Sequence, residues 1–187
     1  MNRVTFGLSN CCVWPITSTA ADGTPTYGAK IDVPGAVSLS LDPAGNTQNV
    51  YADNGVYYSV TPNNGYSGSF NFYTLPDEFR EKILKETKDA KNVWIEDKNA
   101  IPSEFAFGCQ FEGDENASRR VFYRVSCGRI GQASSTNEET VTANTLSLDL
   151  TVMARISDGA VKAKCDADSK AYSTFFGDAP YEKSTTP

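Results

Sequence analysis

Residues 33–84 read VPGAVSLSLDPAGNTQNVYADNGVYYSVTPNNGYSGSFNFYTLPDEFREKIL, and this stretch decides the fold. It holds three segments in which apolar and polar residues alternate, with glycine-containing turns at their joints, and then one helical segment. Alternation with a period of two is typical of half-buried strands. The stretch therefore predicts antiparallel strands that are followed by a single helix.

The first strand of this stretch shows the pattern most clearly. Leu39 and Leu41 alternate with Ser38 and Ser40, and the turn residues 42–46 follow. A second strand is expected at about 48–53, and together the two segments predict a hairpin. Asn-Gly pairs at 54–55 and 64–65 mark further turns, since glycine accepts a positive φ without a Cβ clash.

The helical segment is expected to span 75–88. Pro76 suits the first turn of a helix, and the acidic residues after it complement the helix dipole. Leu75, Phe79 and Ile83 recur at a spacing of four residues. This spacing predicts an amphipathic helix that lies on a sheet.

The second half of the chain returns to alternation. Strands are expected near 105–111, 121–127, 146–152 and 160–166. The length of 187 residues suits one domain, 1–187, with an arm at 1–30, a mobile loop at 131–141 and a disordered tail at 180–187. The fold class is therefore mainly β: an antiparallel sandwich or partial barrel with one flanking α-helix.

The composition narrows the classes of function that the chain could have. The net charge is −6, from 17 basic and 23 acidic residues, which disfavours tight binding to nucleic acid. No apolar run approaches the ~20 residues of a membrane helix, so no membrane contact is expected, and no secretory signal is expected at residues 1–10. The five cysteines predict no disulfide framework, and Cys109 and Cys127 are expected to point inward as small apolar residues.

The sequence contains few side chains that could carry out catalysis. The chain has no histidine, so the commonest general base is missing. The acidic pairs at 114–115 and 138–139 fall in polar loops, where solubility explains them. Asp166 and Asp168 lack the glycine and the final glutamate of an EF-hand loop. We expect no enzyme, no cofactor and no metal site.

Several motifs together resemble the major tail proteins of phages with long, non-contractile tails. These are VTFGLSN (4–10), PGAVSLSLDPAG (34–45), VYADNGVYY (50–58), NGYSGSFNF followed by LPDEFREKIL (64–84), and FAFGCQFEGDENASRRVFYRVSCGR (105–129). The resemblance covers about residues 3–165. Each motif is weak alone, and their order and spacing carry the likeness.

This resemblance implies a tail-tube type of fold and a homo-oligomer of hexameric rings stacked into a hollow tube. The tube would belong to the virion tail, assemble in the host cytoplasm, contact other tail proteins and let DNA pass without specific binding. The expected lumen-facing residues are Ser38, Ser40, Asp42, Ser147, Asp149 and Thr151. By alternation alone, the same polar faces suit a channel wall or bulk solvent equally well.

Contacts between subunits are expected from strand edges and loops. The arm at 1–30 alternates poorly and is expected to reach a neighbouring subunit, with Phe6 and Trp14 at the contact. Arg155, at the end of the last long strand, is expected near a ring boundary. Either the arm or the loop 131–141 would make ring-to-ring contacts.

Three other functions remain open. A connector or tail-end protein of the virion would share the tube fold, and a secretion-system tube protein would share the stacking of rings. A carbohydrate-binding β-sandwich is suggested by tyrosines that could form an aromatic platform. These are Tyr57, Tyr58, Tyr66 and Tyr73.

Overall fold

The computed structural model describes residues 3–134, 136 and 143–183. Its strands are β1 Thr5–Thr19, β2 Pro25–Tyr27, β3 Ile31–Asp32, β4 Ala36–Pro43, β5 Gln48–Ala52, β6 Gly55–Val60, β7 Tyr66–Phe72, β8 Thr87–Lys88, β9 Trp94–Ile95, β10 Phe105–Gly113, β11 Ser118–Cys127, β12 Leu146–Met153 and β13 Lys162–Asp166. The helical segments are α1 Asp77–Phe79, a π-helical turn Arg80–Leu84 and a 3-10 turn Tyr172–Thr174. The prediction of a mainly β, antiparallel fold with one helix is confirmed.

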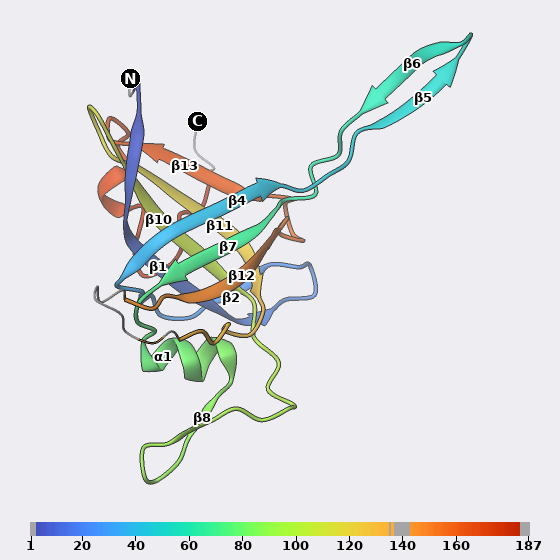
Figure 1. Ribbon diagram of the computed structural model, residues 1–187. Helices are drawn as coiled ribbons and strands as arrows, with labels where there is room; N and C mark the ends of the chain where they lie inside the picture. Colours follow the sequence, from blue (N-terminus) through green and yellow to red (C-terminus); the bar gives the residue numbers. More distant parts are fainter. Residues whose placement is uncertain (1–2, 135, 137–142, 184–187) are drawn as a thin grey trace.

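Nine of the strands in the described part form one antiparallel sheet. Its main order is β2-β1-β10-β11-β12-β7-β4, while β13 pairs with β11 and β3 pairs with β1. The sheet curls so that β4 comes close to β1 without pairing to it, which gives an incomplete barrel (Figure 1). β5–β6 and β8–β9 are separate two-stranded pairs.

The expected hairpin between 37–41 and 48–53 is wrong. β4 pairs instead with β7, from Ala36 opposite Phe72 to Pro43 opposite Tyr66, and β5 pairs with β6. The chain leaves the barrel after β4, makes the β5–β6 hairpin and returns as β7. Residues 42–46, predicted as a turn, lead from β4 toward the β5–β6 hairpin. The Ala44 N–H there donates to Gly65 O, just before β7, at 2.9 Å.

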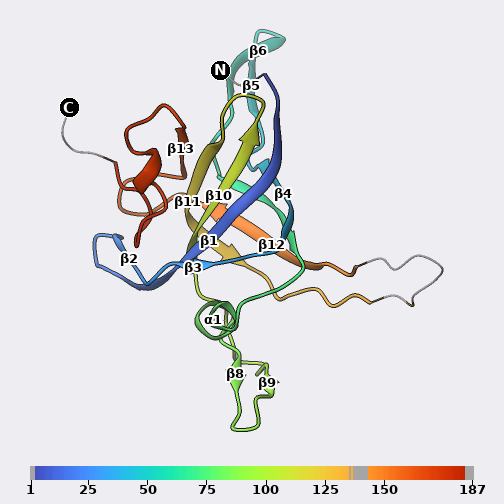
Figure 2. The ribbon, with the colours of Figure 1, turned by 90° about the vertical axis from the view of Figure 1, so that its left-hand side faces the viewer.

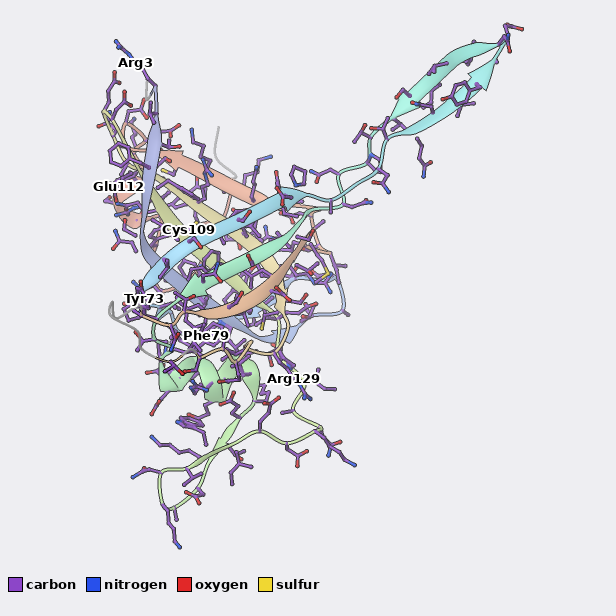
Figure 3. All side chains as sticks on the ribbon, in the orientation of Figure 1. Arg3, Tyr73, Phe79, Cys109, Glu112 and Arg129 are labelled. Atoms are coloured by element: carbon purple, nitrogen blue, oxygen red, sulfur yellow. The ribbon has the colours of Figure 1, made fainter. Side chains whose placement is uncertain are left out.

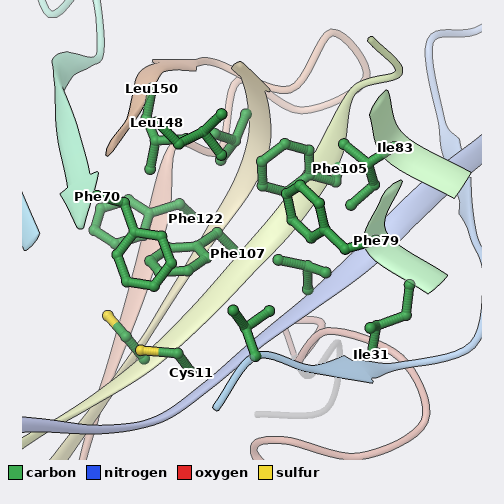
Figure 4. Packing of buried hydrophobic residues seen from close by; sticks show 14 of the residues in the cluster. Cys11, Ile31, Phe70, Phe79, Ile83, Phe105, Phe107, Phe122, Leu148 and Leu150 are labelled. Carbon is green, nitrogen blue, oxygen red and sulfur yellow. The ribbon is translucent and has the colours of Figure 1, made fainter. Parts of the chain in front are cut away.

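The main core fills the inside of the barrel. Aromatic side chains from β7, β10 and β11 meet there, with ring centroids of Phe70 and Phe107 5.3 Å apart (Figure 4). The helix closes the lower end in Figure 1, because Phe79 and Ile83 are buried and Phe79 packs edge-on against Phe105. Cys109 points into this core, as predicted, and Cys127 is half-buried.

The helix is shorter than expected. It ends at Leu84, because Lys85 adopts a left-handed conformation with φ of 60°. Glu86 N–H then donates to Arg80 O, which completes the turn at 3.1 Å. Lys88, predicted as helical, lies in β8 opposite Trp94.

A second, smaller core covers the other face of β1, β10 and β11. The C-terminal segment Tyr172–Glu182 packs there, around Trp14, Phe175 and Tyr123 (Figure 2). Trp14 donates to Gly177 O at 3.1 Å, and the Tyr123 hydroxyl donates to Tyr181 O at 2.7 Å. The expectation of a disordered tail is therefore wrong for 180–183, and 184–187 lie outside the described residues.

The expected N-terminal arm is also wrong, because residues 5–19 form β1, which pairs with β10, β2 and β3 in the main sheet. This strand alternates poorly for two reasons. Its segment from Cys11 to Pro15 is buried on both faces, and Gly7 and Asn10 take positive φ values where the pairing with β10 shifts register. Most of the predicted mobile loop 131–141 lies outside the described residues.

Candidate functional site

Three neighbouring strands, β4, β7 and β12, place polar side chains on the sheet face that points away from the core. The pairing registers align these side chains in three rows across the strands. The rows are Ser38–Asn71–Ser147, Ser40–Ser69–Asp149 and Asp42–Ser67–Thr151. We call these nine residues the polar face; the three strands lie side by side at the front of Figure 1.

The residues between these rows point the other way, into the core. Leu39, Phe70 and Leu148 form one inward row, and Leu41, Gly68 and Leu150 form the next. Successive side chains of a strand point to opposite faces, so one alternating sequence builds both the barrel interior and the polar face. At Gly68 a Cβ would overlap the carbonyl oxygen of Ser40, so the strands approach more closely than any side chain would allow.

The polar face is acidic and lacks positive charge. Asp42 and Asp149 contribute two carboxylates, and none of the three strands contains a lysine or an arginine. Asn71 Nδ2 donates to Ser38 Oγ at 2.9 Å, which ties the first row together. The basic residues of the sheet lie elsewhere: β11 carries Arg119, Arg120 and Arg124, and β13 carries Lys162 and Lys164.

All six residues that the sequence predicted as lumen-facing fall on this one surface. The structure adds the middle strand, whose Ser67, Ser69 and Asn71 stand between the predicted residues of β4 and β12. Sequence analysis missed these three. Their alternation with Phe70 and Phe72 was a usable signal, but it gave no hint that β7 lies between the other two strands.

The residues predicted at subunit contacts separate into two groups. Phe6 is 58% exposed on β1, so the prediction for it stays open. Trp14 is fully buried, with 0% of its surface exposed, and its ring lies 6.2 Å from Phe176 of the same chain. Trp14 is therefore a core residue of the subunit, and the expectation of an exposed contact there is wrong.

Arg155 also lies inside the subunit, with 7% of its surface exposed, which corrects the expectation of a ring-boundary residue. It donates to both carboxylate oxygens of Asp158, pairs with Glu182 and lies 4.6 Å from the ring centroid of Tyr123. Hydrogen bonds from Arg155 lower the pKa of Asp158 to about 2. Burial raises the pKa of Tyr123 to about 12. This cluster holds the C-terminal segment against the sheet.

The β5–β6 hairpin has no partner among the described residues of its own chain. It projects away from the barrel, and every residue of both strands is exposed (Figure 3). Val50 pairs with Tyr58 on one face and Tyr51 pairs with Val56 on the other, while Tyr57 is 78% exposed at the bulge between these pairs. Both faces of the hairpin therefore carry exposed apolar side chains.

The four tyrosines considered as a sugar platform are not brought together. Tyr57 and Tyr58 lie on the projecting hairpin, whereas Tyr66 packs edge-on against Phe122 at 6.2 Å. Tyr73 lies beyond the far end of β7, at the opposite end of this strand from Tyr66 (Figure 3). No shared aromatic surface results.

The described residues offer few groups for metal or redox chemistry. All five cysteines are free, and burial raises the pKa of Cys11 and Cys127 to about 12, so their thiols stay protonated. No group of three metal-ligating side chains occurs among the described residues. In the same residues, no helix has the length and apolar character needed to cross a membrane.

Comparisons with known proteins do not assign a family. No protein-family model matches the chain, and no curated protein matches its sequence.

Proposed function

We propose that this chain is the structural subunit of a phage-type tail tube, in which hexameric rings stack and the polar face of each copy lines the lumen. The observation that carries the proposal is the polar face itself. Nine aligned side chains from three strands include two carboxylates and no cation. The motifs that resemble those of major tail proteins support the same function, and the tube would belong to a virion tail that is assembled in the host cytoplasm.

The chemistry of this face suits a conduit for DNA. DNA carries a phosphate on every nucleotide, and Lys or Arg residues bind it by releasing its counterions. A wall of hydroxyl, amide and carboxylate groups would not hold the polymer. Repeated around a ring, Asp42 and Asp149 would repel it over about one Debye length, ~8 Å at physiological salt. DNA would then pass without specific binding.

Electron microscopy of the purified chain tests the assembly. Negatively stained protein at high concentration is expected to form hollow filaments of constant width. Single rings that do not stack would favour the connector or tail-end function instead. Protein that stays monomeric at every concentration and salt condition would contradict both.

Cysteine protection tests which face lines the bore. We would label S40C with a small maleimide and with a maleimide that carries a long polyethylene glycol chain, before and after assembly. K170C, an exposed position just before the C-terminal segment that covers the opposite side of the sheet, is the matched control, and wild type measures the background from native thiols.

The expected result is that assembly blocks the bulky reagent at S40C and not at K170C, while the small reagent still reacts at both. Equal bulky labelling of S40C before and after assembly would overturn the assignment of the polar face to the lumen.

A further inference from the structure

A cavity lies at the opposite end of β10 and β11 from the helix. It has a volume of about 420 Å3, within the ~300–1,000 Å3 range of ligand pockets. Its wall combines the first residues of β11 with the last residues of β13. Neither the polar face nor the two cores account for it.

One buried group in this wall is unsatisfied. Ser118 is 2% exposed, and its hydroxyl has no hydrogen-bond partner among the described residues. A buried hydroxyl without a partner costs about 1–3 kcal/mol, and such groups in a folded protein call for an explanation. A ligand group that enters the cavity would supply the missing partner.

The charges around Ser118 are also unusual. Ser118 and Arg120 share one face of β11, and in the pairing with β13 they stand opposite Asp166 and Lys164. Arg120 and Lys164 are therefore directly opposite like charges, an arrangement that destabilises a sheet unless something neutralises it. Lys164 bonds to Asp166 at 2.9 Å, and the Arg120 guanidinium lies 4.2 Å from the ring centroid of Phe111.

The residues that line the cavity differ in how deeply they are buried. Ser118 is buried and Arg120 half-buried, whereas Lys164, Asp166 and Asp168 are exposed at the rim. The cavity thus presents a hydroxyl and a guanidinium inside, and a rim with one cation and two carboxylates outside. It fits a dipolar group that leads with an oxygen anion and carries an amide behind it.

The tip of the β5–β6 hairpin has this chemistry. Asp53 and Asn54 form its two-residue turn, both with positive φ values of 49° and 65°. The hairpin contains one carboxylate and no basic residue between Gln48 and Val60. The hairpin projects to the upper right of Figure 1, whereas the cavity lies at the other side, where β13 ends and β11 begins.

We propose that the Ser118–Arg120 cavity receives the Asp53–Asn54 turn of a second copy of this chain. The Asp53 carboxylate accepts hydrogen bonds from Ser118 and Arg120, and the Asn54 amide faces the rim carboxylates. Because hairpin and cavity lie on opposite sides, the contact is head-to-tail and propagates from copy to copy. The inference rests on the proposed function, since it supplies a contact between subunits of the tube.

Two variants test the contact. We would measure the concentration at which the purified full-length chain self-associates, by analytical ultracentrifugation. D53K reverses the charge of an exposed turn and is expected to raise this concentration about tenfold or more. E81K, an equal charge reversal on the exposed side of the helix, is the matched control and should leave it unchanged.

S118A gives a sharper readout, because the proposal predicts that it stabilises the monomer and weakens self-association. Removal of the unpartnered hydroxyl should raise the melting temperature of the monomer, yet weaken self-association several-fold. A purely structural Ser118 would change the melting temperature alone, and self-association as strong as that of wild type would overturn the proposal. The double variant D53K/R120E should recover association relative to D53K, since the new lysine then meets a new glutamate at the proposed partner position.

The outcomes separate this inference from the proposed function. If wild type and D53K form tubes at the same protein concentration, the hairpin contact is overturned and the tube function still stands. Self-association of the wild type that D53K abolishes, but without hollow filaments, would support the contact and count against the tube.

Discussion

The two halves of the sheet differ in what covers their outer face. β1, β10 and β11 are packed on both sides, by the main core and by the C-terminal segment. β4, β7 and β12 are packed on one side only, and their other side is the polar face. The half with β1, β10 and β11 therefore contributes mainly to stability. The half with β4, β7 and β12 keeps one surface available for function.

The largest expected effect separates these two outer faces. W14A removes a fully buried indole from the covered half and should lower the free energy of unfolding by about 3–5 kcal/mol. S69A, at the centre of the polar face, should change it by less than about 0.5 kcal/mol. Chemical denaturation measures both. Similar losses for the two variants would mean that the outer faces are equivalent.

A middle-sized effect is expected at Gly68, on the inner side of the half with the polar face. G68A places a methyl group against the backbone of β4, and we expect a loss of about 1–3 kcal/mol in urea unfolding. G128A is the matched control, because a Cβ there meets only Asp149 Cβ at 3.9 Å. Equal stabilities of the two variants would contradict the close approach of β4 to β7.

The smallest effect concerns the Arg155–Asp158 pair in the cluster that holds the C-terminal segment against the sheet. The pKa of Asp158 is lowered from 3.8 to about 2, so the folded state prefers the ionised carboxylate. This stability is fully present above pH ~4 and is lost as the pH falls through about 2.

D158N should cost about 1 kcal/mol at pH 7, since Asp158 is partly exposed. The difference between D158N and wild type should disappear near pH 2 in unfolding curves measured against pH. A difference that stays constant from pH 7 to pH 2 would show that the Arg155 contact does not depend on the charge of Asp158.

The comparison also explains which parts of the fold the sequence could predict. Alternation identified β4 and β12 correctly, because each has one buried and one exposed face. β1 was missed as a strand, since a segment buried on both sides does not alternate. Its residue Trp14 was then misassigned to a surface contact.

Pairing could not be read from local turn signals. The residues 42–46 resemble a hairpin turn, yet the partner of β4 is β7, which begins after the whole β5–β6 hairpin. Sequence analysis therefore found six residues of the polar face and missed the three of its central strand. The cavity at Ser118 was missed as well, because nothing local shows that a buried hydroxyl lacks a partner.

The close contact at Gly68 has a consequence for protein engineering. The inward rows of this half pack in the main core, whereas the nine outward positions face away from it and include the Asn71–Ser38 hydrogen bond. Designers could therefore rewrite those positions freely, with cations, aromatics or metal chelators, and keep the same scaffold. A nanopore assembled from such copies would have a permeant selectivity that is tuned independently of its folding.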